Sequence, residues 1–181
     1  SAASDVYKRQ VYGASAVDAT GAWVVRFPSG PGAPTALRRV GLDGRVLGDV
    51  EAPSTAQIAG FLGGRVVLQQ FGRIWTMGLD GVVTPYATGV IAAVNGSSIL
   101  WVGCDDRAAC TYRLGTATTP DTRRTSLQTS YLFAYGGGEG GGIAGQNSLS
   151  PDAATLVGTV VNDRFDGQLR IVDLATGALL E

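Results

Sequence analysis

The chain has no histidine, one lysine and few glutamates, which removes most of the side chains that catalysis relies on. Without histidine, Ser-His-Asp triads, histidine metal ligands and histidine acid–base catalysis are excluded within the 181 residues. After residue 10, glutamate occurs only at Glu51, Glu139 and Glu181, and most aspartates stand in turn sequences. These residues do not support a paired-carboxylate hydrolase site. We therefore predict no catalytic residue, no cofactor-binding residue and no metal ligand in this chain.

Long apolar runs and basic clusters are also missing. No apolar run approaches the roughly 20 residues that a membrane-spanning helix needs, so we predict no membrane span in this segment. The formal net charge is −1 and the arginines are scattered, whereas nucleic-acid binding needs a concentrated basic surface. The expected partner is therefore an unknown protein or small-molecule ligand, with no nucleic acid.

Glycine is abundant, and its placement predicts many short strands joined by tight turns. The chain contains 27 glycines and only 16% charged residues, a composition that does not suit solvent-exposed helices. Four dipeptides with strong hairpin propensity separate apolar, β-branched segments: Asp43-Gly44, Gly63-Gly64, Asp80-Gly81 and Asn95-Gly96. The predicted strands fall into four groups of four, at residues 11–50, 56–87, 90–127 and 131–181.

A short internal repeat supports this grouping. The segment Gly41-Leu-Asp-Gly44 returns 37 residues later as Gly78-Leu-Asp-Gly81. We extend the equivalence of Leu42 and Leu79 to Leu114 and Leu174, with the glycine-rich insertion at residues 136–142 explaining the last, longer spacing. Self-similarity at a period of roughly 20–50 residues predicts a propeller, a solenoid or an array. We favour a propeller over a β-sandwich or another β-solenoid.

The clearest repeat unit lies between Ser148 and Leu180. It runs from a Ser-Pro-Asp turn through an apolar strand, an Asp-Gly hairpin, an alternating strand at residues 168–173 and a Thr-Gly turn. This order resembles the blades of WD40-like, YVTN-type and TolB-type bacterial propellers. No Gly-His pair is present, and Val172-Asp173 stands where WD40 repeats have Trp-Asp, which favours a divergent bacterial propeller. The resemblance implies an all-β fold, a β-propeller segment of about four four-stranded antiparallel blades.

The two ends of the chain differ from its repeat pattern. Residues Ser1–Gln10 resemble a translated sequencing adapter, and Lys8 within them is the single lysine of the chain. We exclude this segment from the fold and assign residues 11–181 to the propeller repeats; the alternative is an ordinary polar N-terminus. Since the last group ends as its outer strand begins, we expect an incomplete ring that aggregates when it is expressed alone.

Cys104 and Cys110 are the only cysteines, and they bracket a predicted turn at residues 105–109. Two residues at the base of one hairpin are close enough for a disulfide to bridge, although two reduced structural thiols are also compatible with the sequence. A zinc site would need further ligands, and a redox motif would need a Cys-x-x-Cys spacing. A disulfide would indicate an oxidising compartment, in agreement with the resemblance to exported propellers, and we predict an extracytoplasmic location.

Three other features could carry a function. Residues 162–173 partly match a calcium loop, but Arg164 occupies a position that requires an oxygen ligand, so we favour an ordinary hairpin. The glycine-rich run at 136–142 contains Glu139, which would repel phosphate, and is interpreted as a flexible insertion. Trp75 and Trp101 are assigned to packing between blades rather than to a sugar-stacking platform. The aromatics at positions 131, 133 and 135 share one face of a predicted strand, in the core or at a binding rim.

The function that these observations favour is a noncatalytic β-propeller module of an exported bacterial protein, acting in interaction or ligand binding. The alternative is the propeller portion of an enzyme, such as a propeller-linked serine peptidase, a glycosidase or a quinoprotein, whose catalytic residues lie outside this chain.

Overall fold

A computed structural model gives the fold, and it describes residues 12–18, 20–26, 36–53, 56–70, 72–104, 110–125, 148–161 and 167–180. These residues form four antiparallel sheets and no helix. The first sheet contains β1 (Tyr12–Asp18), β2 (Gly21–Arg26), β3 (Ala36–Gly41) and β4 (Val46–Glu51). The second contains β5 (Gln57–Leu62), β6 (Arg65–Gln70), β7 (Arg73–Met77) and β8 (Val83–Thr88). The third contains β9 (Val90–Val94), β10 (Ser98–Cys104), β11 (Cys110–Thr116) and β12 (Arg123–Arg124).

The fourth sheet contains three strands, β13 (Ser148–Leu149), β14 (Thr155–Val161) and β15 (Gly167–Asp173). A fourth strand was expected from Ala178 onward, and the structure has a single bridge there, between Leu179 and Val172. In all four sheets the strands pair in the order in which they occur in the chain. Every sheet is therefore an up-and-down meander.

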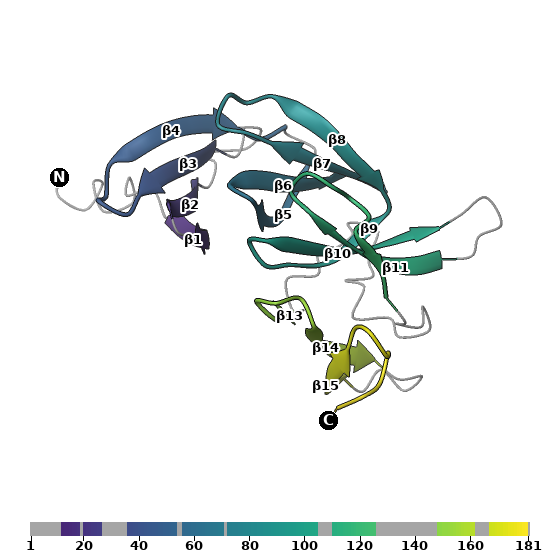
Figure 1. Ribbon diagram of the computed structural model, residues 1–181. Coiled ribbons are helices and arrows are strands. Elements are labelled where there is room, and N and C mark those ends of the chain that lie inside the picture. The colour runs from purple at the N-terminus through teal and green to yellow at the C-terminus, as the bar shows by residue number, and fades with distance from the viewer. Residues whose placement is uncertain are drawn as a thin grey trace.

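The sheets follow one another along an open arc, with the first and the fourth at its two ends (Figure 1). The opening strand of each sheet lies beside that of the next, so that β1 packs near β5, β5 near β9, and β9 near β13. This is the radial arrangement of propeller blades around a common axis. The all-β β-propeller segment of about four blades, in an incomplete ring, is thereby confirmed.

The turns behave as their glycines predict. Gly44, Gly64, Gly81 and Gly96 all have φ between 66° and 79°, a left-handed conformation that glycine adopts without the steric penalty other residues meet. The two Gly-Leu-Asp-Gly segments form matching hairpins, because Gly44 N–H donates to Gly41 O at 2.9 Å and Gly81 N–H to Gly78 O at 3.1 Å.

The wider leucine equivalence was wrong. Leu42 and Leu79 are exposed in the hairpins that follow β3 and β7, whereas Leu114 lies inside β11 and is 7% exposed. Leu174 follows β15, but it is fully buried in the core between the third and fourth sheets. The spacing alone does not distinguish a residue inside a strand from one in the turn that follows.

Three apolar cores lie between neighbouring sheets. The core between the first and second sheets contains Trp23, Leu37, Val50, Phe61, Val66, Leu68 and Met77. The core between the second and third contains Leu62, Val67, Ile74, Ile91, Ile99 and Trp101. The core between the third and fourth contains Leu100, Tyr112, Leu114, Leu149, Leu156, Val172 and Leu174. Since side chains alternate along a strand, Val67 enters one core and its neighbours Val66 and Leu68 enter another.

Tryptophan and arginine form a cross-strand pair in two of the sheets. Trp23 lies opposite Arg39, whose guanidinium carbon is 5.7 Å from the centre of the Trp23 ring. Trp101 lies opposite Arg113, whose guanidinium carbon is 5.4 Å from the centre of the Trp101 ring. Trp101 is 5% exposed in the second inter-sheet core, and Trp75 is half-buried against the first. The structure thus places Trp75 and Trp101 in packing between blades, as predicted.

Candidate interaction surface

In the hairpins that follow β3 and β7, the conformation of the turn exposes a leucine side chain. Asp43 Oδ1 accepts a hydrogen bond from Arg45 N–H, and Asp80 Oδ1 accepts one from Val82 N–H, both at 3.0 Å. The aspartates therefore tie down the turn backbone, an Asx arrangement typical of tight turns. The leucine between the glycine and the aspartate is left in solvent, with 72% exposure for Leu42 and 43% for Leu79.

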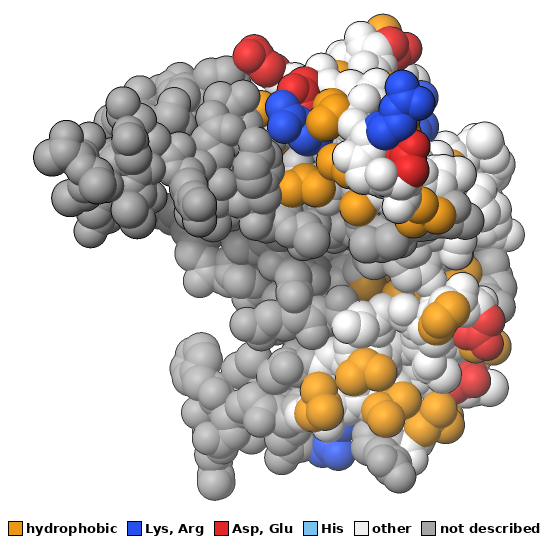
Figure 2. Space-filling view, turned by 90° about the vertical axis from the view of Figure 1, so that its left-hand side faces the viewer, with side chains coloured by type: hydrophobic (Ala, Val, Ile, Leu, Met, Phe, Trp, Pro, Cys, Tyr) orange, Lys and Arg blue, Asp and Glu red, His pale blue; other side chains and the backbone are white. Residues whose placement is uncertain are grey.

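Exposed aliphatic side chains extend from these hairpins along the outer strands of the first two sheets. We name this set the hairpin surface; it consists of Leu42, Val46, Leu47, Leu79, Val82 and Val83, all at least 38% exposed. Leu79 Cδ2 lies 3.3 Å from the point that a Cβ on Gly48 would occupy, so the second hairpin rests on β4. Figure 2 shows hydrophobic side chains beside acidic and basic ones on the upper part of the molecule. Exposed apolar patches with polar rims mark interaction sites.

A groove of about 320 Å³ separates the outer edge of the second sheet from the turn after β11. Arg65, Thr76, Thr84 and Tyr86 line it from the second sheet, and Thr118 and Pro120 line it from the third. A second cavity of about 430 Å³, lined by Arg73 and Trp75 among others, shares Pro85 and Tyr86 with the groove.

Tyr86 links the second sheet to the third. Its hydroxyl donates to Thr116 O at 2.6 Å, and Thr119 O lies 3.3 Å away. Burial raises the pKa of Tyr86 to about 12, because desolvation disfavours the phenolate. A Cβ on Gly115 would collide with the Tyr86 hydroxyl and with the backbone of Pro120. Glycine at this position therefore permits the close approach of the two sheets.

Arg65 supplies the positive charge of the groove. Its Nε donates to Thr76 Oγ1 at 3.2 Å, and its Nη2 donates to Thr84 Oγ1 at 3.4 Å. Within the described part of the chain, Arg65 forms no ion pair with a carboxylate. The groove therefore presents a guanidinium that two neutral hydroxyls hold in place.

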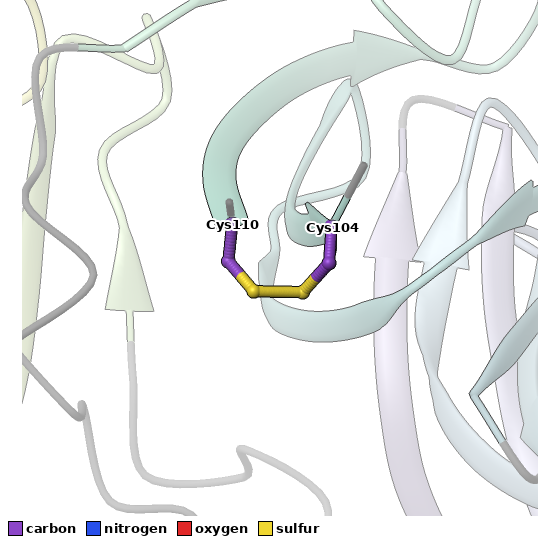
Figure 3. Close-up of a disulfide and its surroundings, with 2 residues drawn as sticks. All are labelled: Cys104 and Cys110. Carbon is purple, nitrogen blue, oxygen red and sulfur yellow. A yellow bond between two sulfur atoms is a disulfide. The ribbon is translucent and has the colours of Figure 1, made fainter. Parts of the chain in front are cut away.

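The two cysteines lie opposite each other at the tip of the hairpin formed by β10 and β11. Figure 3 shows their sulfur atoms bonded, and the Cα atoms of Cys104 and Cys110 are 3.9 Å apart. Cys104 is exposed. The hairpin is thus closed by a covalent link outside the three apolar cores.

Several features singled out in the sequence lie outside the described residues. They are the segment at 1–10, the aromatics at 131, 133 and 135, the glycine-rich run at 136–142 and most of the calcium-like loop, at 162–166. Among the described residues, no group of three His, Cys, Asp or Glu side chains could hold a metal ion. No helix long and apolar enough to cross a membrane occurs in that part of the chain either.

Comparison with known proteins gives a fold but no family. No family model matches the chain, and no curated protein matches it. A solved structure of TolB from Acinetobacter baumannii matches with a TM-score of 0.59 at 15% identity, covering 94% of this chain and 43% of TolB. The shared fold is the propeller. The chain therefore spans less than half the length of that protein, and the similarity concerns the fold alone. A solved structure of a eukaryotic initiation factor matches with a TM-score of 0.41 at 13% identity, covering 94% of this chain and 53% of that protein. A TM-score this low supports no conclusion about this chain.

Proposed function

We propose that this propeller segment is a noncatalytic binding module that docks a protein partner through the hairpin surface. The observation that carries the proposal is the exposure of six aliphatic side chains across the hairpins and outer strands of two adjacent sheets. Protein interfaces combine such an apolar centre with a polar rim. The rim here includes Asp43, Asp80 and the ion pair between Arg38 and Asp49, whose Nε–Oδ1 distance is 2.7 Å.

The proposed location is extracytoplasmic. The bonded pair Cys104 and Cys110 supports it, because disulfides persist in oxidising compartments and are rare in the cytosol. Mass spectrometry of the protein isolated from its source, without reductant, tests this point. A cysteine pair that is fully reduced in the native protein would count against export.

Photo-cross-linking tests the docking surface. With a benzoylphenylalanine at Val82 of the full chain, we expect a discrete adduct in an extract of the source organism. The double variant Leu42→Ser/Leu79→Ser should abolish the adduct, because it removes the exposed leucine of each hairpin.

Leu169→Ser on β15 is the matched control, because Leu169 is also an exposed leucine, at 69%, but lies in the fourth sheet. The control should leave the adduct intact. Equal loss in both variants would reject the hairpin surface as the docking site.

A further inference from the structure

We propose that the groove between the second and third sheets binds a carboxylate group, with Arg65 as its cation. This site adjoins the hairpin surface, since Asp80 lies beside both, but it has its own lining and the proposal does not depend on docking there. The ligand chemistry is a monoanionic carboxylate on a short aliphatic stem. Such a group occurs in a free small acid and in an acidic side chain of a peptide.

The geometry of Arg65 leaves donors for a ligand. A guanidinium has five N–H donors in a fixed fork, and the described contacts of Arg65 are one from Nε to Thr76 and one from Nη2 to Thr84. Thr76 is itself 4% exposed, so the Nε bond is anchored to the interior of the sheet. The remaining N–H groups of the fork match the two oxygens of a carboxylate, which arginine binds in a bidentate way.

Asp80, an acidic residue close to Arg65, limits the charge that the groove can accept. Arg65 Nη1 and Asp80 Oδ1 lie 3.3 and 2.8 Å from the point that a Cβ on Gly78 would occupy. Asp80 Oδ1 is held by Val82 N–H at 3.0 Å and does not form an ion pair with Arg65. The local charge is therefore one guanidinium partly offset by one nearby carboxylate. This balance favours a monoanion over a phosphate dianion, since each further ligand charge is repelled by Asp80.

The size and walls of the groove suit a short stem. Its volume of about 320 Å³ is near the lower end of the roughly 300–1,000 Å³ typical of ligand pockets. The exposed residues Thr84 and Thr118 add hydroxyl groups to the lining, and Pro85 and Pro120 offer apolar surface for methylene groups. The hydrogen bond from Tyr86 to Thr116 O ties the two walls together, so the site is formed before a ligand arrives.

The neighbouring cavity provides an internal control. Arg73 lines it and is exposed, and within the described residues no threonine hydroxyl accepts a hydrogen bond from its side chain. An exposed arginine loses more conformational entropy when it orders around a ligand. Arg65 and Arg73 of the second sheet thus carry the same charge and differ in how firmly the side chain is held before a ligand binds.

The test uses the full chain, labelled for NMR, and follows the amide signals of Thr84 and Thr118. The probes are acetate, the capped peptide acetyl-Ala-Glu-Ala-amide and its Gln counterpart. We expect saturable shifts with acetate and the Glu peptide, and binding at least about tenfold weaker for the Gln peptide, which equals about 1.4 kcal/mol. Tighter binding of the Glu peptide than of acetate identifies a peptide side chain as the ligand, and the reverse order identifies a free acid.

Variants decide whether Arg65 is responsible. Arg65→Gln should weaken acetate binding at least about tenfold, whereas Arg73→Gln should leave it within about twofold. Should Arg65→Gln not fold, Thr118→Val, which leaves Arg65 and its two threonine partners untouched, should weaken binding severalfold. Equal binding of the Glu and Gln peptides, absence of saturable shifts, or phosphate binding as tightly as acetate would overturn the proposal. Shifts confined to the groove also separate this site from docking at the hairpin surface.

Discussion

The second and fourth sheets differ in how many of their faces are buried. In β6 the consecutive residues Val66, Val67 and Leu68 are all at most 1% exposed, because a neighbouring sheet covers each face. In the fourth sheet, Val172 is fully buried while Leu169 in the same strand is 69% exposed. Figure 2 shows hydrophobic side chains gathered on the lower part of the molecule, at the height of this sheet.

The comparison teaches that position in the arc decides whether an apolar residue contributes to a core. Strands buried on both faces have continuous apolar runs, whereas strands buried on one face alternate. β3, in the first sheet, alternates between buried and half-buried residues, as expected for a sheet at the other end of the arc. The following predictions measure how large the difference is.

Truncating a leucine should have the largest effect in the second sheet. Leu68→Ala removes a side chain that is 1% exposed, and such cavities cost about 2–5 kcal/mol of unfolding free energy. Leu169→Ala should change it by no more than about 0.5 kcal/mol. Urea unfolding of the full chain, followed by tryptophan fluorescence, measures both. Similar costs for the two variants would mean that Leu169 is covered in the folded protein.

Removing the hairpin disulfide should have the next largest effect. Cys104 and Cys110 are separated by six positions, and closing a loop of this size stabilises the folded state by about 2 kcal/mol in the chain-entropy model. The double variant Cys104→Ser/Cys110→Ser should lose this amount relative to the oxidised protein and match the reduced protein. If oxidised and reduced proteins unfold at the same urea concentration, the bond does not contribute to stability.

Tyr86→Phe should cost about 1 kcal/mol, because Thr116 O loses its hydrogen bond across the second inter-sheet boundary. The folded-state pKa of Tyr86, about 12, lies above the value of about 10 for an unfolded tyrosine. As the pH rises, the unfolded chain therefore loses the phenol proton of Tyr86 before the folded chain does. The contribution of neutral Tyr86 to folding stability is complete below pH 10 and is lost as the pH rises toward 12. The parent should lose more stability than Tyr86→Phe over that interval, and parallel losses would contradict the assignment.

The smallest effect is expected at the turn that begins β14. The hydrogen bond from Ser150 Oγ, followed by that from Ala154 N–H, lowers the pKa of Asp152. Since the folded-state pKa is depressed, the stabilisation is present above the unfolded value of about 3.9 and disappears as the pH falls below it. Asp152→Asn should lower the melting temperature slightly at pH 7 and not at pH 2. A larger effect than that of Tyr86→Phe would reverse the order proposed here.

Turn chemistry made the local structure predictable. Asp-Gly, Gly-Gly and Asn-Gly pairs have few low-energy conformations, and all four that were singled out form turns with a left-handed glycine. Residue spacing was less informative, since Leu114 fits the numerical repeat yet lies within β11. The outer strand expected at the end of the third group, 90–127, is represented in the described part by Arg123 and Arg124 alone.

The groove could not be predicted, because it is built from segments that no periodicity connects. Arg65 and Thr118 are more than fifty positions apart, and they share a cavity through the packing of one sheet against the next. That no carboxylate of the described residues pairs with Arg65 is also a three-dimensional property. A single sequence shows that an arginine follows a Gly-Gly turn, but not which side chains lie opposite it.

The meander connectivity also has a consequence for synthesis. Each strand pairs with the strand immediately before or after it in the chain, so every sheet can complete its hydrogen bonds before the next has left the ribosome. Loop closure is cheap at such short separations, and each new sheet meets a finished neighbour against which its apolar face can pack. We expect folding to proceed vectorially from the first sheet, with nearest-neighbour coupling of the kind that repeat proteins show. Ribosome-bound chains in which β8 has cleared the exit tunnel should accordingly protect β1–β4 from proteolysis, whereas chains in which β4 alone has cleared it should not.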